Sequence, residues 1–307
     1  MIFFTIQKDI KFTNFYSKLN FLSLFLIILS ILIIVFKGLN LGVDFKGGTL
    51  IELRTSNSSV GISDIRQSLI KLNLGEVNVK KFGKKNDYLV KIEKTKVSDK
   101  NFIKSINTSL SNSLGTEVNF RRVENVGPKV SNELLMSGLL AICLSLAAML
   151  FYIWIRFEWQ FSLGAIIAII HDVVITIGIF SLFSFEINLS IVAAVLTIVG
   201  YSMNDTVVIF DRIRENLKKY TKISILEIAD ISTNETLSRT LITSVTTLLA
   251  LFSIYFFGGQ ILNGFSLTMI IGVIVGTYSS IFVATPILKF TNVNSKTVLK
   301  EEDKASI

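Results

Sequence analysis

The sequence predicts a polytopic α-helical membrane protein with one extracytoplasmic α+β domain. Half of the 307 residues are hydrophobic, the mean hydropathy is +0.60, and only two residues are proline. That share of apolar residues is too high for an ordinary soluble domain. A helix needs about 20 apolar residues to cross the roughly 30 Å hydrocarbon core. Six segments approach that length: 20–37, 134–155, 161–183, 189–210, 241–257 and 265–288.

The basic residues predict how these spans are oriented. Lys and Arg occur in the N-terminal segment 1–19, at Arg156, in the segment 211–240 and in the tail 289–307. The short loops 184–188 and 258–264 contain neither. Because positive charge collects on the cytoplasmic side, both termini are expected in the cytoplasm, and the net charge of +8 reflects orientation rather than nucleic-acid binding. The first span is expected to be an uncleaved signal anchor.

Residues 38–133 are expected to form a periplasmic domain of ferredoxin-like type. Apolar patterns predict the order βαββαβ. The predicted strands cover Val43 with Phe45 and then Thr49 to Leu53, Val77 to Phe82, Tyr88 to Ile92, and Val118 to Val123. Helices are predicted over 62–72 and 102–114, and Gly75 and Gly115 follow them where a left-handed cap is needed. The cytoplasmic segment 211–240 is predicted to form amphipathic helices at the membrane surface.

An acidic residue occurs inside the fourth predicted span. Asp205 follows Asn204 in GYSMNDTVVIF, residues 200–210. A charge near a helix centre costs about 2.5 to 3.5 kcal/mol on insertion scales, so Asp205 is expected to face a protein interior or a water-filled cavity. It would lie about 24 Å from the outer end of its helix. The alternative to proton binding is a static hydrogen-bonding role shared with Asn204.

Arg239 is the predicted partner of Asp205. It belongs to SRTLITSVTTLLALF, residues 238–252, which is expected to open the fifth span from the cytoplasmic side. An acid beside a base can be poised to bind and release a proton, because burial and a nearby cation shift the carboxyl group in opposite directions. A snorkelling arginine at the interface is the other interpretation.

Two further spans carry small or polar residues at a spacing of four. Asp172 shares a helix face with Gly164 and Ala168, a pattern that permits close helix approach. For Asp172 a proton role and a packing role both stay open, while the neighbouring His171, the only histidine, is expected to be structural. In the sixth span, Gly272 and Gly276 belong to a similar stripe, which could face this chain or another one.

The sequence contains no enzyme signature. It lacks a phosphate-binding loop, a metal-ligand cluster and a nucleophile beside a base. We therefore expect neither an enzyme nor a cofactor or bound metal. A proton moving down a membrane potential of about 100 mV releases about 2.3 kcal/mol, and this is the energy source that an intramembrane acid can use.

Five ordered motifs resemble the SecF family, the smaller of two related subunits that accompany the bacterial protein-export channel. They are LGVDFKGGTLIEL at 41–53, VGPKVSNEL at 126–134, HDVVIT at 171–176, GYSMNDTVVIFDRIREN at 200–216 and ETLSRTLITSVTTLLALF at 235–252. The family belongs to the resistance-nodulation-division superfamily, whose members work as twelve-helix units built from two six-helix halves. The resemblance therefore implies a SecD partner in the bacterial inner membrane.

The resemblance also implies a role for each polar residue. Asp205 would be the proton-carrying acid and Arg239 its cationic neighbour, with Asp172 and Asn204 secondary. The pair of subunits would use the proton motive force to promote late, SecA-independent steps of preprotein export. The SecYEG channel, SecA, and also YajC and YidC are the further partners implied. Two alternatives stay open: half of a small-molecule exporter, and a structural subunit that moves no protons.

Overall fold

The computed structural model describes residues 9–57, 59–75, 77–81, 86–92, 100–295 and 297–298. Phe82, Lys8 and the tail lysines at 296, 300 and 304, on which predictions were made, lie outside this range. The chain divides into two compact units. The membrane unit contains Met1–Leu39, Ala141–Phe185 and Ser190–Ile307, and the α/β unit contains Asn40–Leu140 and Glu186–Leu189.

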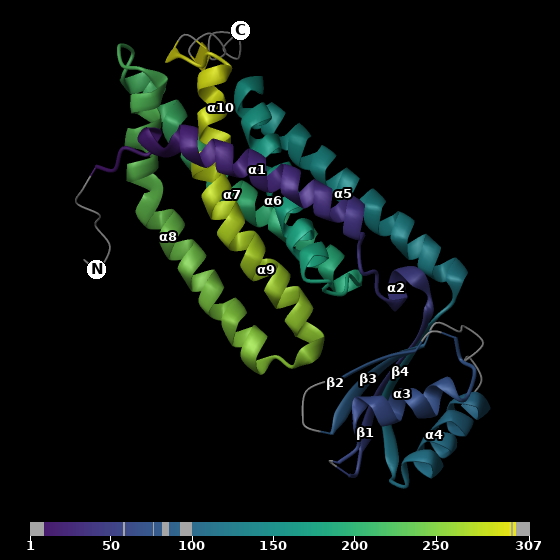
Figure 1. Ribbon diagram of the computed structural model, residues 1–307. Helices are drawn as coiled ribbons and strands as arrows, with labels where there is room; N and C mark the ends of the chain where they lie inside the picture. The colour runs from purple at the N-terminus through teal and green to yellow at the C-terminus, as the bar shows by residue number, and fades with distance from the viewer. Residues whose placement is uncertain are drawn as a thin grey trace. The chain divides into compact units, whose positions relative to one another are not determined.

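Six helices in the described residues are long and apolar enough to cross a membrane, which confirms the predicted fold class. The last span is built from three consecutive helical segments, α9, η1 and α10, of which η1 is a π-helix. Helices α9 and α10 are labelled in Figure 1. The bounds are α1 Thr13–Lys37, α5 Pro128–Arg156, α6 Trp159–Leu182, α7 Leu189–Lys219, α8 Ile225–Phe257, α9 Gln260–Ser279, η1 Ser280–Ala284 and α10 Thr285–Phe290.

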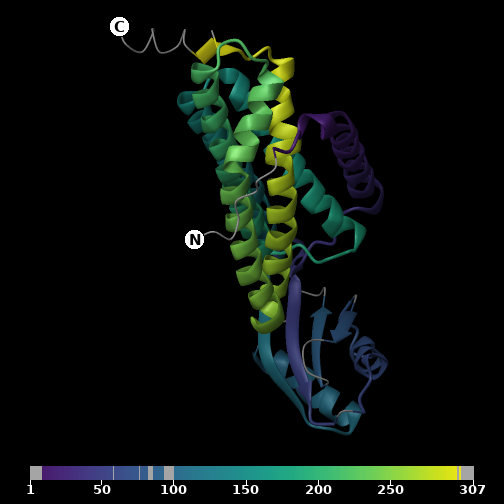
Figure 2. The ribbon, with the colours of Figure 1, turned by 90° about the vertical axis from the view of Figure 1, so that its left-hand side faces the viewer.

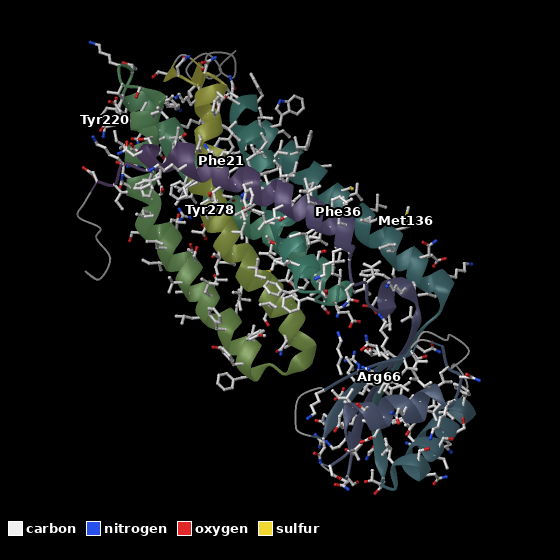
Figure 3. The ribbon with its side chains drawn as sticks, viewed as in Figure 1. Phe21, Phe36, Arg66, Met136, Tyr220 and Tyr278 are labelled. Carbon is white, nitrogen blue, oxygen red and sulfur yellow. The ribbon has the colours of Figure 1, made fainter. Side chains whose placement is uncertain are left out.

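The helices of the membrane unit form an inner and an outer set. At least half of the most apolar stretch is buried in α6, α7 and the last span, but at most 17% in α1, α5 and α8. Helix α1 packs against α6, and α8 lies beside α9 (Figures 1 and 2). Apolar side chains such as Phe21 and Phe36 on α1 point outward (Figure 3), as expected for a surface that meets lipid.

The segment 211–240, predicted to form amphipathic helices at the membrane surface, is instead made of the end of α7 and the beginning of α8. Helix α7 continues to Lys219, and α8 begins at Ile225 after a short turn. Ile213 and Leu217 are buried on the same face of α7 as Ile209. This packing stabilises the helix beyond the predicted end of the span at residue 210. Ser224 and Glu227 form a capping box that starts α8 well before the predicted residue 241.

The α/β unit has the predicted βαββαβ order. Its strands are β1 Gly48–Thr55, β2 Val77–Lys81, β3 Asp87–Ile92 and β4 Val118–Val126, and its helices are α2 Val43–Lys46, α3 Ile62–Ile70 and α4 Lys100–Leu114. The antiparallel sheet has the order β2-β3-β1-β4, which is compatible with a ferredoxin-like domain. The core of this unit contains Ile51, Tyr88, Ile65 and Leu110.

The prediction of a strand at Val43 and Phe45 is wrong. These residues form the single turn of α2, and the first strand begins only at Gly48. Gly47, which follows α2, and Gly48, the first residue of β1, have φ values of 77° and 122°. Residues with a Cβ atom rarely adopt this backbone conformation, so the two glycines make the sharp change from helix to strand possible.

Candidate functional site

Asp205 lies in the interior of the membrane unit. Asp205 is on α7 and is only 2% exposed, and it lies next to Ser244 of α8 and Thr277 of α9. These two hydroxyl groups are 2.7 Å apart and hydrogen-bonded to each other. Among the described residues, the Oδ2 atom of Asp205 has no hydrogen-bond partner. A buried carboxyl oxygen without a partner is costly, so this group is a candidate for binding a proton.

Arg239 and Asn204 do not share the environment of Asp205. Arg239 is within electrostatic range of the carboxyl group, but the described residues contain no ion pair between the two. It lies well inside α8 rather than at its start, and it is exposed. Asn204 is also exposed, because it points to a different side of α7 from Asp205. The predicted direct pairing of Asp205 with Arg239 is therefore not present in this conformation.

Asp172 forms the most densely bonded polar centre in the described part of the membrane unit. Its Oδ2 accepts hydrogen bonds from Ser202 Oγ on α7 at 2.5 Å and from Ser279 Oγ on α9 at 2.8 Å. Its Oδ1 is 2.8 Å from His171 Nδ1. Asp172 is 0% exposed. One carboxyl group thus joins the three inner helices α6, α7 and α9.

His171 is part of this centre, although the sequence analysis assigned it only a structural role. The side chain is fully buried, and its Nε2 has no partner among the described residues. Its ring stacks on Tyr278 with centroids 6.0 Å apart. Tyr278 reaches α1, where its hydroxyl donates to Leu19 O at 2.9 Å and contacts Ser23 Oγ at 2.7 Å (Figure 3). Adjacent residues in a helix rarely point to the same face. The sequence pattern therefore did not predict that His171 and Asp172 contact each other.

The π-helical segment η1 begins directly after Ser279. Ser280, its first residue, contacts Thr206 Oγ1 of α7 at 2.9 Å, one residue beyond Asp205. Short π-helical turns within α-helices are often found at functional sites. The segment therefore connects the surroundings of Asp172 with those of Asp205.

The small residues of α6 and α9 permit close helix contacts within this chain. A Cβ atom at Gly272 would lie 2.2 Å from Ile198 Cγ1, and one at Gly276 would lie 2.9 Å from Ser202 Cβ, both on α7. A Cβ atom at Gly164 would lie 2.8 Å from Ala284 O. Ala168 is 1% exposed in the same core. These contacts hold α7, and with it Asp205, against its neighbours.

Ion pairs gather at one end of the membrane unit. Arg212 of α7 is 2.7 Å from Glu235 of α8, and Arg156 is 2.9 Å from Asp211. Arg214 is 3.2 Å from the buried Glu158. The basic residues that predicted the cytoplasmic side therefore also fix the ends of α5, α7 and α8 relative to one another.

The described residues contain no group of three or more His, Cys, Asp or Glu side chains that could hold a metal ion. The polar groups around Asp172 and Asp205 are carboxyl, hydroxyl and imidazole groups. Such groups can bind and pass protons.

Comparisons with known proteins agree with this architecture. Residues 104–294 match the family described as protein export membrane protein SecD/SecF, C-terminal, and residues 32–59 match the SecD/SecF GG motif. The chain is 44% identical to the protein translocase subunit SecF of Rickettsia bellii, over 91% of this chain and 92% of that protein. It is 45% identical to SecF of Desulfurispirillum indicum, over 83% and 82%.

The structure is also similar to solved structures of SecDF. It matches the translocon-associated SecDF of Thermus thermophilus with a TM-score of 0.85 and 32% identity over 95% of this chain. A super-membrane-facing form of SecDF matches with a TM-score of 0.70 and 32% identity over 99% of this chain. The chain spans about two fifths of the length of these SecDF chains, namely 40% and 41%.

Proposed function

The chain belongs to the SecD/SecF family of protein export membrane proteins, and on that premise we propose that it is the SecF subunit of a bacterial Sec translocase. In this proposal it pairs with a SecD subunit, and the two together use the proton motive force to promote late, SecA-independent steps of preprotein export. The observation that carries the proposal is the buried Asp205 with its unpartnered Oδ2.

Asp205 is the proton carrier in this mechanism. It is buried on α7, and Ser244 of α8 and Thr277 of α9 provide neighbouring hydroxyl groups. When the carboxyl group is charged, Arg239 is attracted to it; when it takes up a proton, this attraction is lost. The packing of α7 and α8 then changes, and the α/β unit moves between two poses. Asp172 has a secondary role, because its hydrogen bonds join α6, α7 and α9.

An exposed polar face on α7 and α8 supports the proposal that a partner subunit covers these helices. It contains Asn204 on α7 and Arg239 on α8, and in the described residues neither side chain has a hydrogen-bond or ion-pair partner. Tyr201 and Thr247 connect the two helices beside it through a 3.4 Å contact. Lipid cannot satisfy an amide or a guanidinium group, so helices of another subunit are the better cover.

The remaining parts of the proposal follow from the family. The subunit would be located in the bacterial inner membrane, with both termini in the cytoplasm and the α/β unit in the periplasm. The translocating preprotein, SecYEG and SecA would be its working partners, with YajC and YidC as further candidates. It would not be an enzyme, because the energy comes from proton movement rather than from covalent chemistry.

Export into inverted membrane vesicles tests this function. Vesicles that contain SecD and this subunit should export a preprotein faster when a proton gradient is applied, and Asp205→Asn should abolish that acceleration. The matched control is Glu215→Gln, which neutralises an exposed acid on the same helix and should leave export unchanged. If Asp205→Asn responds fully to the gradient with normal assembly, the alternative of a structural subunit is favoured. Export that never depends on this subunit, together with drug efflux, would favour an exporter.

A further inference from the structure

The short segment Glu186–Leu189, which follows α6 and ends at the first residue of α7, belongs to the α/β unit. It pairs with residues 40–42 in a parallel bridge between Leu41 and Ile187. Gly42 N donates to Ile187 O at 2.7 Å, and Ile187 N donates to Asn40 O at 2.8 Å. We call the contact between residues 40–44 and 186–189 the loop bridge.

The loop bridge leaves little space for a side chain at Gly42. A Cβ atom there would lie 3.1 Å from both Glu186 Oε1 and Ile187 O, and 3.3 Å from Asn188 Cβ. The sheet also holds the bridge, because Lys91 of β3 donates to Leu41 O at 3.0 Å and lies 3.9 Å from Glu186 Oε1. The two segments are therefore fixed to the α/β unit by backbone, side-chain and packing contacts together.

Asp44 extends the loop bridge to the start of α7. Its Oδ2 accepts a hydrogen bond from the backbone N–H of Leu189 at 3.0 Å, and Leu189 is the first residue of α7. The first amides of a helix have no partner within the helix, and a carboxylate there is favoured by hydrogen bonding and by the helix dipole. Asp44 thus caps, from 145 positions away, the helix that carries Asp205.

We propose that Asp44 is a positioning residue that couples movement of the α/β unit to α7. The chain enters the α/β unit from α1 and leaves it through α5. The loop bridge is a third connection between this unit and the membrane helices, and it joins α7, the helix that carries Asp205. Asp205 lies sixteen residues, about 24 Å, along the uninterrupted helix α7 from Leu189. A displacement of the α/β unit pulls on Leu189 through Asp44, and a change at Asp205 returns along the same helix. This coupling rests on the function proposed above.

Alanine and asparagine at position 44 separate capping from other roles of the residue. Asp44→Ala removes the acceptor, while Asp44→Asn keeps an acceptor oxygen and is itself a good capping residue. In the complex with SecD, Asp44→Ala should accelerate amide hydrogen exchange at Leu189 by about fivefold. It should also reduce the acceleration of export by the proton gradient several-fold, with export driven by ATP alone unchanged. Asp44→Asn should behave as the wild type does.

A disulfide across the loop bridge provides a readout that a merely structural role would not change. Two residues paired in a β-bridge are close enough to form a disulfide when both are replaced by cysteine. The variant carries Leu41→Cys and Ile187→Cys, and Cys143, an exposed free thiol, is replaced by serine. Oxidation should restore the gradient response of Asp44→Ala, and a reductant should remove it again.

The outcomes distinguish this inference from the proposed function. A full gradient response of Asp44→Ala, in a complex where Asp205→Asn has lost that response, would overturn the coupling role alone. Failure of the disulfide to restore Asp44→Ala would also count against coupling. A full response of Asp205→Asn would instead overturn the proposed function itself.

Discussion

His171 Nδ1 lies 2.8 Å from Asp172 Oδ1, and both residues are fully buried among the inner helices of the membrane unit. The other carboxyl oxygen accepts hydrogen bonds from Ser202 and Ser279, so the acidic side chain is held from three directions. This arrangement makes Asp172 the point at which α6, α7 and α9 are connected.

Replacing Asp172 should destabilise the protein strongly. Asp172→Ala leaves His171 and the Ser202 hydroxyl group buried without their acceptor, whereas Ser279 keeps Gly276 O at 3.1 Å. Breaking such a buried network costs about 3 to 5 kcal/mol. Asp172→Asn keeps one acceptor oxygen and should cost less. Thermal unfolding of the full chain in detergent measures both. Equal unfolding temperatures for Asp172→Ala and the wild type would show that the network contributes nothing to stability.

A methyl group at Gly272 should also be destabilising. The added Cβ atom would overlap Ile198 of α7, at 2.2 Å from its Cγ1, so the helices must separate. Overpacking of this kind costs about 1 to 3 kcal/mol. Gly200→Ala is the matched control, because its nearest contact in this chain would be Met149 Cε at 3.9 Å. The prediction is wrong if both alanine variants unfold at the same temperature in detergent.

The exposed polar face should matter for assembly rather than for folding. Asn204→Leu removes an unpartnered amide, so it should leave the unfolding temperature of the isolated chain unchanged or raise it. Recovery of SecD in a pull-down with this variant should fall several-fold. Val245→Ala, an exposed apolar position on α8, serves as the control and should retain SecD. Undiminished SecD recovery with Asn204→Leu would place the partner on another face.

Tyr88 should give the α/β unit a pH-dependent stability. Its hydroxyl donates to Val60 O at 2.5 Å, and the residue is 0% exposed. Tyr88→Phe leaves that carbonyl unpaired and should cost about 1 to 3 kcal/mol. Burial, and secondarily Asp64, raise the pKa of the Tyr88 phenol. The phenol therefore adds stability below its ordinary pKa of about 10, and this is lost as the pH rises through the folded value.

The comparison of Tyr88→Phe with the wild type at two pH values tests whether this stabilisation is lost as the pH rises. The difference in unfolding free energy should be largest near pH 8 and should shrink above about pH 10, because the unfolded wild type then loses its phenolic proton. A difference that grows with pH would contradict the assignment.

Hydropathy was sufficient to predict the six spans and the βαββαβ order, but it did not predict where the helices end. Helix α7 runs on to Lys219 because Ile213 and Leu217 continue its buried face beyond the apolar segment. Helix α2 was missed since its four residues are too few to show a helical period.

The candidate site was predictable in its residues but not in its contacts. Asp205 is buried as its apolar neighbours implied, whereas Arg239 is exposed and forms no ion pair with it in the described residues. The cap that Asp44 provides for Leu189 joins positions 145 apart, and no local pattern indicates such a contact. Long-range contacts of this kind are set by the tertiary structure.

The most direct measurement of the central proposal is infrared difference spectroscopy of the complex with SecD as the pH is changed. Every carboxyl group that gains a proton shows a C=O stretching band, so the band of Asp205 is isolated by subtracting the spectrum of Asp205→Asn from that of the wild type. This difference should contain a C=O band that appears as the pH falls, and Asp172→Asn and Glu215→Gln should both retain that band. A wild-type spectrum that shows no carboxyl band beyond those of Asp205→Asn would contradict the assignment of Asp205 as the proton carrier.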